Sequence, residues 1–187
     1  MAILPIVEIP DPILRKRARK VRRIDKKTLT IAHNMVETMR NAGGVGLAAN
    51  QVGELQRIIV IQLPDEEEAR IYFNPEITKS VGEREVVEGC LGLPGYRGLV
   101  TRSVWIRFRG TDHTEKVIKF QADNLLSQAL EHEVDHLNGI LYTDHLIAHE
   151  SLYKIESDPI LDSSNIPRNE ARDDESYLDT PASHKIK

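Results

Sequence analysis

The chain has 187 residues, a formal net charge of −4, 40% hydrophobic residues and a single cysteine. This length favours one compact domain. The lone cysteine excludes an internal disulfide framework and any zinc site that needs two thiolates from this chain. Residues 1–12 lack the pattern of a signal peptide, and no apolar run approaches the roughly 20 residues that cross a bilayer. We therefore expect a cytoplasmic protein with no membrane partner and, at this net charge, no specific nucleic-acid partner.

The first predicted elements are a basic segment and a helix. The basic segment, residues 15–27, contains nine Lys and Arg residues. It is either a solvated surface or a docking site for an anionic surface such as RNA. Asp25 is the expected N-cap of a helix that ends near Asn41, in which apolar residues recur at helical spacing: Leu29, Ala32, Met35, Val36 and Met39.

Short β-branched runs then predict strands at residues 57–61, at 71–74 with an end at Pro75, and at 85–87. Residues 104–108 and 116–120 predict a hairpin with its turn at residues 110–112. Asp123 is the expected N-cap of a second helix that stops at Asn138-Gly139. This order predicts an α+β fold of antiparallel strands. Residues 1–156 are the expected domain, and residues 157–187 a polar, mobile or peripheral tail.

The second helix contains the motif HEVDH at residues 132–136. Residues four apart lie on one helical face, so His132 and His136 can bind one ion while Glu133 reaches a water on that ion. Because the motif lies in a capped helix with an apolar face, we interpret it as a metal site. Asp135 either pairs with a basic residue such as Arg102 and orients a ligand, or lies at the surface.

The third ligand decides the class of enzyme, because catalytic zinc-type sites usually have three protein ligands. Metzincin proteases place a histidine six residues after the second one, but that position is Tyr142 here. Thermolysin-like proteases use a downstream glutamate, which Glu150 or Glu156 could provide. Cys90 is the favoured candidate, because the glycines at positions 89 and 92 let the backbone approach an ion closely.

A third element, residues 43–53, is rich in glycine and other small residues. Its glycines permit close approach of the backbone to a ligand, and Gln51 offers an amide that could donate to an oxyanion. The element lacks the lysine of a P-loop and the order of a dinucleotide motif, which excludes a phosphate cradle. Taken alone, it could equally be a turn that packs small residues against a core.

Together the three elements resemble those of the peptide deformylases. That family has the segments G-φ-G-φ-A-A-x-Q, E-G-C-L-S and H-E-x-D-H-L in this order, which here correspond to residues 44–51, 88–92 and 132–137. The similarity extends from Ile9 to about Asp144, roughly three-quarters of the chain. It implies antiparallel β-strands packed around a central helix that carries the HExxH motif and binds the metal.

The resemblance implies a metal-dependent hydrolase. Its substrates would be N-formylmethionyl nascent peptides, from which it would remove the formyl group as formate. One divalent ion would be held by Cys90, His132 and His136. In this family the ion is typically iron, Fe(2+), and Zn(2+), Ni(2+) or Co(2+) can replace it. A set of one cysteine and two histidines does not identify the metal by itself.

The resemblance also implies roles for other residues. Glu133 would take the proton of a water activated by the ion and pass it to the departing amine. The side chain of Gln51 and the backbone N–H of Leu91 would stabilise the oxyanion. The residues expected to bind the peptide come from the motifs, the segment after Cys90 and the second helix: Gly44, Gly46, Gly89, Arg97, Leu125, Gln128 and Ala129.

Two positions depart from the family pattern. Position 92 is Gly, where bacterial members usually have Ser. Gln128 is polar, although it lies on the helical face that lines the methionine pocket with apolar groups in this family. Gln128 either turns toward solvent or a polar neighbour, or it weakens the binding of an apolar side chain.

Two alternative functions follow from these observations. Gly92 and Gln128 suggest a related amidase with a changed acyl or side-chain preference. The basic segment suggests an inactive paralogue that docks on the ribosome, but Glu133 argues against it because a structural metal site does not need that base. The second histidine pair, His145 and His149, has no Glu directly after its first member, and we expect both side chains to be solvated.

Overall fold

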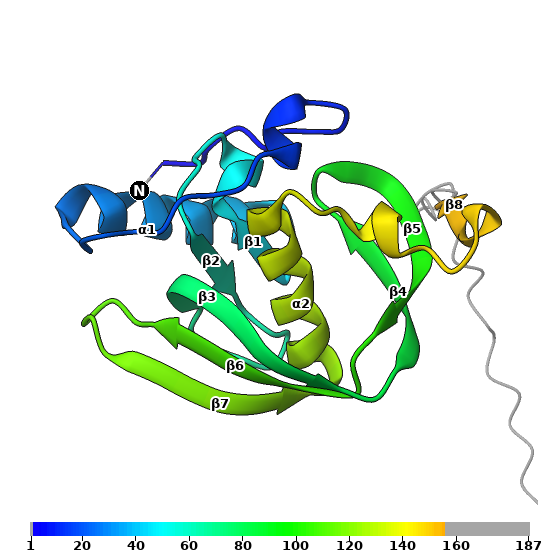
Figure 1. Cartoon of the computed structure of the whole chain (residues 1–187). Coiled ribbons are helices and arrows are strands. Elements are labelled where there is room, and N and C mark those ends of the chain that lie inside the picture. The colour runs from blue at the N-terminus through cyan, green and yellow to red at the C-terminus, as the bar shows by residue number, and fades with distance from the viewer. Residues whose placement is uncertain (1, 156–187) are drawn as a thin grey trace, which may run out of the picture. The chain divides into compact units, whose positions relative to one another are not determined.

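A computed structural model describes residues 2–155 of the chain. Its strands form two antiparallel sheets, a five-stranded one in the order β1-β2-β3-β6-β7 and a three-stranded one in the order β4-β5-β8. Helix α2 lies between the two sheets, as Figure 1 shows. The α+β fold predicted from the sequence is confirmed. The elements are α1 Lys26–Asn41, α2 Asn124–Asn138, β1 Gly46–Ala48, β2 Ile58–Ile61, β3 Arg70–Val81, β4 Arg84–Cys90, β5 Leu93–Arg102, β6 Trp105–Thr111, β7 Val117–Asp123 and β8 Leu152–Lys154.

The two helices cover opposite faces of the five-stranded sheet. In strand β2, Ile59 and Ile61 pack with α2, whereas Ile58 and Val60 pack with α1. All four side chains are fully buried. This explains the continuous apolar run at residues 58–61, because a strand covered on both faces has no solvent side to mark with polar residues.

All four predicted helix ends lie at the expected residues in the structure. The side chain of Asp25 accepts a hydrogen bond from the Thr28 N–H, and α1 ends at Asn41. Gly139 ends α2 with a φ of +78°, which glycine adopts without strain. Asp123 holds the N-cap position of α2, as predicted, but its side chain makes no cap hydrogen bond.

Two strand boundaries differ from the prediction. Strand β3 does not end at Pro75 but continues to Val81, because a register shift between Phe73 and Glu76 accommodates the proline. The turn of the β6–β7 hairpin lies after residues 110–111, which pair with Ile118 and Val117 inside the ladder. The turn is closed instead by the Asp112 side chain, which accepts hydrogen bonds from the Thr114 and Lys116 N–H groups.

Three short or glycine-containing strands, β1, β5 and β8, have no counterpart in the prediction. Their side-chain patterns lack a clear period of two, and pairing with neighbouring strands defines them. Within residues 2–155, no helix is long and apolar enough to span a membrane. The predicted tail, residues 157–187, lies outside the described residues.

Candidate metal centre

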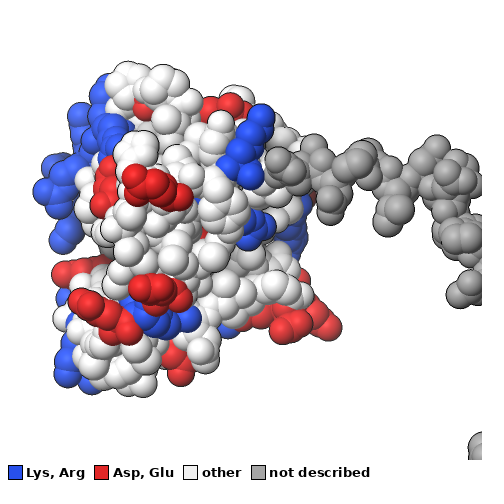
Figure 2. Space-filling model, turned by 90° about the vertical axis from the view of Figure 1, so that its right-hand side faces the viewer, with Lys and Arg blue, Asp and Glu red and all other residues white. Residues whose placement is uncertain are grey.

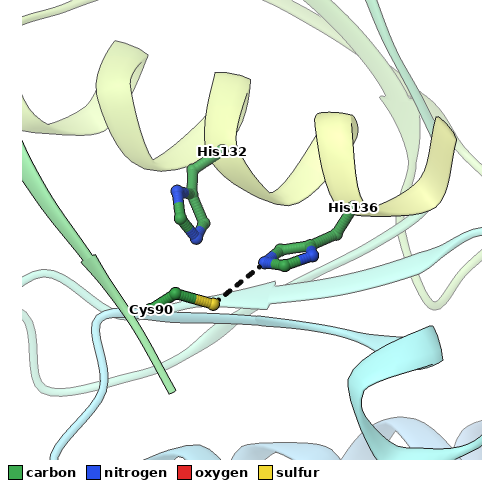
Figure 3. Close-up of side chains that lie close together, drawn as sticks. All are labelled: Cys90, His132 and His136. Carbon is green, nitrogen blue, oxygen red and sulfur yellow. Dashed lines mark hydrogen bonds between the residues drawn. The ribbon is translucent and has the colours of Figure 1, made fainter. Parts of the chain in front are cut away.

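Strand β4 and helix α2 bring three ligand atoms together. Cys90 ends β4, and His132 and His136 project from one face of α2 toward it (Figure 3). The ligand atoms of the three side chains lie within 4.8 Å of one another, and Cys90 Sγ is 3.2 Å from His136 Nε2. A spacing of four residues on a helix places both imidazoles on the same side, and the end of β4 supplies the thiolate. The sequence separation of 42 residues between Cys90 and His132 is closed by the packing of α2 between the sheets.

A buried ion-pair network holds His132 in place. Glu88, two residues before Cys90 on β4, lies 2.8 Å from His132 Nδ1 and accepts two hydrogen bonds from Arg102, at 2.8 and 3.0 Å. Arg102 also donates to Asp135 at 2.5 Å. With Nδ1 of His132 bound to a carboxylate, its Nε2 remains for an ion, which is the usual arrangement around metal-ligating histidines.

The electrostatics of the two histidines differ. Burial lowers the pKa of His136 well below its ordinary value, so its imidazole stays neutral and free to ligate. Burial acts in the same direction on His132, but its hydrogen bonds with Cys90 and Glu88 outweigh it and raise its pKa. An ion that binds here replaces protons on the ligands, so its affinity depends on pH.

Glu133 lies beside the ligands in a buried position. Its side chain is nearly inaccessible, one carboxylate oxygen has no hydrogen-bond partner among the described residues, and burial raises its pKa to about 7. A Cβ on Gly46 would lie 2.9 Å from the Cγ and Cδ atoms of Glu133. Glycine at position 46 is therefore required by the carboxylate that packs on its backbone, and Glu133 is suited to exchange a proton near neutral pH.

The amide of Gln51 has a defined orientation. Its Oε1 accepts a hydrogen bond from the Ala48 N–H at 2.8 Å, and its Nε2 donates to Cys90 Sγ at 3.4 Å. Because the oxygen is held by the backbone, the NH₂ group points to the ligand cluster. Leu91, the residue after Cys90, packs over Gly44, where an added Cβ would lie 2.7 Å from its side chain.

The ligands open into a cavity of about 410 Å³. Every predicted catalytic, metal-binding or peptide-binding residue lines this cavity except His136, which lies behind it and is 1% exposed. Gln128 donates to the backbone carbonyl of Val87 at 3.1 Å, so its amide has turned to a polar neighbour while its side chain still forms part of the wall. Val87 and Leu125 are both partly exposed at this wall.

Several residues of the site were not among the predicted ones. Glu88 was noted only as part of a motif, and Tyr96 and Ile155 line the cavity from β5 and from the end of β8. The ring of Tyr142 stacks on His132 with a centroid distance of 6.0 Å. Only Glu88 could have been found from the sequence, because it directly precedes the Gly-Cys pair of a motif. Tyr96, Tyr142 and Ile155 belong to segments that carry no motif.

Two further predictions can be compared with this geometry. Glu150, the thermolysin-like candidate, is exposed and is not part of the ligand cluster, and Glu156 lies outside the described residues. The prediction that His145 is solvated is wrong, because its Nε2 lies 2.9 Å from the Asp135 carboxylate and the side chain is only 35% exposed. His149 is exposed, as predicted.

A second, larger cleft of about 1080 Å³ lies against another face of α2. Arg102, Asp135 and His145 line it together with other charged residues, but none of the three candidate ligands does. Size therefore does not identify the site. The smaller cavity is distinguished by one thiolate, two imidazoles and a buried carboxylate that converge, and this donor set suits a divalent transition metal.

Comparisons with known proteins show which family the chain belongs to. The polypeptide deformylase family model matches residues 3–151. A peptide deformylase of Dehalococcoides mccartyi strain CBDB1 is 46% identical over 158 residues, 84% of this chain and 95% of the relative. One of Alkaliphilus metalliredigens is 48% identical over 147 residues, 79% of this chain and 99% of the relative.

Solved structures show the same fold. The crystal structure of a peptide deformylase from Legionella pneumophila has a TM-score of 0.77 at 39% identity and covers 80% of this chain and 89% of its own. The crystal structure of the Synechococcus elongatus peptide deformylase in complex with actinonin has a TM-score of 0.77 at 34% identity. It covers 79% of this chain and 83% of its own. Because the family model matches residues 3–151, which are most of this chain, the chain belongs to the polypeptide deformylase family.

Proposed function

We propose that this chain removes the formyl group from the N-terminal formylmethionine of newly synthesised polypeptides, with one divalent ion held by Cys90, His132 and His136. The observation that carries the proposal is the convergence of these three ligand atoms within 4.8 Å beside the buried carboxylate of Glu133. Membership of the deformylase family supports it. Residues 1–156 are the proposed catalytic domain, in agreement with the family match over residues 3–151.

The chemistry is the hydrolysis of a formamide. A divalent ion at this site would lower the pKa of a water molecule and polarise the formyl carbonyl. Glu133 accepts one proton from the attacking water as the new C–O bond forms, and returns it to the amine nitrogen as the C–N bond breaks. Nε2 of Gln51 and the backbone N–H of Leu91 donate hydrogen bonds to the oxygen that carries the negative charge. Formate and the free amino terminus are the products.

The cavity wall supports recognition of the peptide. Gly44, Gly46 and Gly89 expose backbone along the cavity, and Leu125, Gln128 and Ala129 line it from α2. Arg97 is exposed at its edge, where it meets the peptide beyond the formylated residue. The alternative of an amidase with a changed side-chain preference would need the polar amide of Gln128 to face the bound side chain, whereas this amide is hydrogen-bonded to the Val87 carbonyl.

Iron, as Fe(2+), is the proposed native ion, and Zn(2+), Ni(2+) and Co(2+) suit the same mixed thiolate and imidazole ligands. A thiolate ligand next to a redox-active ion is open to oxidation, so activity of the iron form should fall in air. Metal analysis of protein purified without oxygen checks the identity of the ion. The Cys90→Ala variant is expected to retain far less metal.

Formate release decides the function. Protein loaded with iron or nickel is assayed on a formyl-Met-Ala-Ser peptide and, for side-chain preference, on the same peptide with serine in place of methionine. We expect turnover of the methionine peptide, and block of turnover by actinonin, which the Synechococcus relative binds. A fully metallated sample that releases no formate from either peptide rules out the activity. Faster turnover of the serine peptide favours the amidase alternative.

A ribosome contact is the proposed role of the basic segment, in a cytoplasmic enzyme whose substrates are nascent chains. Arg15 pairs with Asp144, whereas the other eight cations of the segment are exposed and form no ion pair within residues 2–155. In Figure 2, Lys and Arg side chains lie mainly along the left edge of the view, with others at the upper right. Cosedimentation with ribosomes should weaken after Arg17→Glu with Arg19→Glu, but not after Arg107→Glu with Arg109→Glu on β6. Equal binding by both variants removes this role.

A further inference from the structure

The N-terminal segment, residues 4–14, runs over two turns of the candidate metal centre. The Val7 N–H donates to the backbone carbonyl of Gln51 at 2.7 Å, and the Ile9 N–H donates to that of Gly92 at 2.9 Å. In an extended chain, alternate residues direct their N–H groups to the same side. One short stretch therefore holds two turns that are separated by about 40 residues in the sequence. In Figure 1 the dark blue start of the chain runs next to the cyan turn that follows β1.

Gln51 and Gly92, whose carbonyls accept these two hydrogen bonds, also donate to the sulfur of Cys90. Nε2 of Gln51 lies 3.4 Å from Cys90 Sγ, and the backbone N–H of Gly92 donates to the same atom at 3.3 Å. The carbonyls of Gln51 and Gly92 thus bind the N-terminal segment while their donors bind the thiolate. A shift of the segment moves both donors relative to the sulfur.

Glycine at position 92 lets the segment lie this close. A Cβ on Gly92 would be 3.1 Å from the Val7 carbonyl oxygen, 3.7 Å from Cys90 Sγ and 3.8 Å from the Leu14 side chain. Leu14 is 1% exposed, so this contact is part of the core. An added Cβ at this distance is tighter than most real contacts, so the Val7 backbone would have to shift by a few tenths of an ångström.

The same segment reaches the helix that carries the histidines. Nδ2 of Asn50, the residue before Gln51, donates to the His136 carbonyl at 2.6 Å and to the Leu14 carbonyl at 3.4 Å. Asn50 is fully buried. The N-terminal segment is therefore tied to all three elements that build the centre, namely the Gln51 turn, the Cys90 turn and α2.

We infer that the N-terminal segment is a clasp in which Val7 and Ile9 are positioning residues that hold the Gln51 amide and the Gly92 N–H on the Cys90 sulfur. The inference rests on the proposed function, in which the Gln51 amide donates to the oxyanion. An amide misplaced by a fraction of an ångström stabilises that charge less well, so the clasp acts on the turnover number.

A proline substitution tests the clasp. Val7→Pro removes the N–H donor and keeps an extended backbone, whereas Glu8→Pro removes an N–H that makes no hydrogen bond within the described residues. We expect Val7→Pro to lower kcat on the formyl-Met-Ala-Ser peptide by about 10- to 100-fold with KM nearly unchanged. Glu8→Pro should keep the wild-type kcat. Wild-type kcat in Val7→Pro, or equal losses in both variants, overturns the inference.

A double-mutant cycle separates positioning from a general loss of structure. Because Val7 acts through Gln51, the Val7→Pro change should have little effect on kcat in a Gln51→Ala background. Effects that multiply in the double variant contradict the clasp. If Val7→Pro does not fold, Gly92→Ala replaces it in the cycle, since its Cβ removes no donor group but shifts the Val7 backbone by a few tenths of an ångström. Gly92→Ala with wild-type kcat then overturns the inference.

The cobalt-loaded protein supplies a readout that does not depend on turnover. Hydrogen bonds to a ligand sulfur reduce its electron donation to the ion. The absorption band from thiolate to metal should therefore move to longer wavelength in Val7→Pro, and should stay in place in Glu8→Pro. An unmoved band in a folded Val7→Pro protein contradicts the clasp. If the wild type itself releases no formate, the proposed function fails, and the band shift still tests the clasp.

Discussion

Two histidine pairs of equal spacing lie in very different surroundings. His132 and His136 are 7% and 1% exposed and project from one face of a regular helix toward Cys90. His145 ends one short 3₁₀ turn and His149 begins another, so no helix aligns their side chains. No third ligand atom joins His145 and His149 among the described residues. Spacing alone therefore makes no metal site: a continuous helix must align the rings, and another element must bring a further donor.

The two pairs are nevertheless connected. His145 contacts Asp135, Asp135 binds Arg102, and Arg102 binds Glu88, which holds His132. Exposure of the side chains rises along this path, from 2% for Glu88 to 18% for Asp135 and 35% for His145. Interactions should weaken in the same direction, because solvent screens charges more strongly as they become exposed.

Loss of the bound ion is the largest difference expected between the pairs. His132→Ala or His136→Ala leaves one histidine and one cysteine, which cannot hold a divalent ion tightly, so bound metal and formate release should both disappear. His145→Ala and His149→Ala should keep one ion per chain. Metal analysis after gel filtration measures the content. A His149→Ala protein that loses its metal as fully as His132→Ala contradicts the comparison.

The glutamates beside the two pairs, Glu133 directly after His132 and Glu150 directly after His149, should differ next most. Glu133→Gln keeps the shape of the side chain but cannot accept a proton, so kcat should fall by about 10²- to 10⁴-fold while metal is retained. Glu150→Gln, directly after His149, is the matched control and should keep wild-type kcat, since this residue is exposed. Steady-state formate release measures both. Full activity in a metallated Glu133→Gln protein would exclude Glu133 as the base.

Acid should destabilise the buried network more than the surface. Burial opposes ionisation of Glu88, but hydrogen bonds from His132 and Arg102 outweigh it and lower its pKa from 4.5 to about 2. A carboxylate with a lowered pKa stabilises the fold above its unfolded pKa, and this stabilisation is lost as the pH falls from 4.5 toward 2. Its size is about 3 kcal/mol of unfolding free energy.

Urea unfolding of the metal-free protein at several pH values measures this dependence. Glu88→Gln should flatten it between pH 4.5 and 2. Asp144→Asn removes the surface partner of Arg15, an exposed pair, and should leave the dependence almost unchanged. If the unfolding free energy depends on pH equally in Glu88→Gln and in the wild type, the buried Glu88 carboxylate is not the source of that dependence.

Arg102 should give the smallest of these effects. Arg102→Lys keeps the charge but loses the two parallel hydrogen bonds to Glu88, so His132 is held less firmly. Metal affinity, measured by competition with a chelator, should fall by about 10- to 100-fold. His145→Ala, at the exposed end of the path, should change it by no more than the roughly 1 kcal/mol of a surface pair. A larger loss of metal affinity in His145→Ala than in Arg102→Lys would contradict the expectation that interactions weaken as the side chains become more exposed.

Local patterns were sufficient for much of the fold. The period of the apolar residues located both helices, Asp25 and Gly139 marked two of their ends, and the continuous run before Gln62 located β2. Patterns failed where pairing with a neighbour decides the structure, as in β5 and β8. They also failed at Pro75, where a register shift lets the strand continue.

For the site, the sequence by itself determined what a single helix can determine. The spacing of His132, Glu133 and His136 follows from 3.6 residues per turn and needs no partner. Tertiary structure decided that Cys90 and not Glu150 lies beside them, since contacts between distant segments depend on how α2 packs between the sheets. It also decided the hydrogen-bond partners of Glu88, Arg102 and Val7, because a buried charge or N–H group finds its partner only when the elements that carry both have packed together.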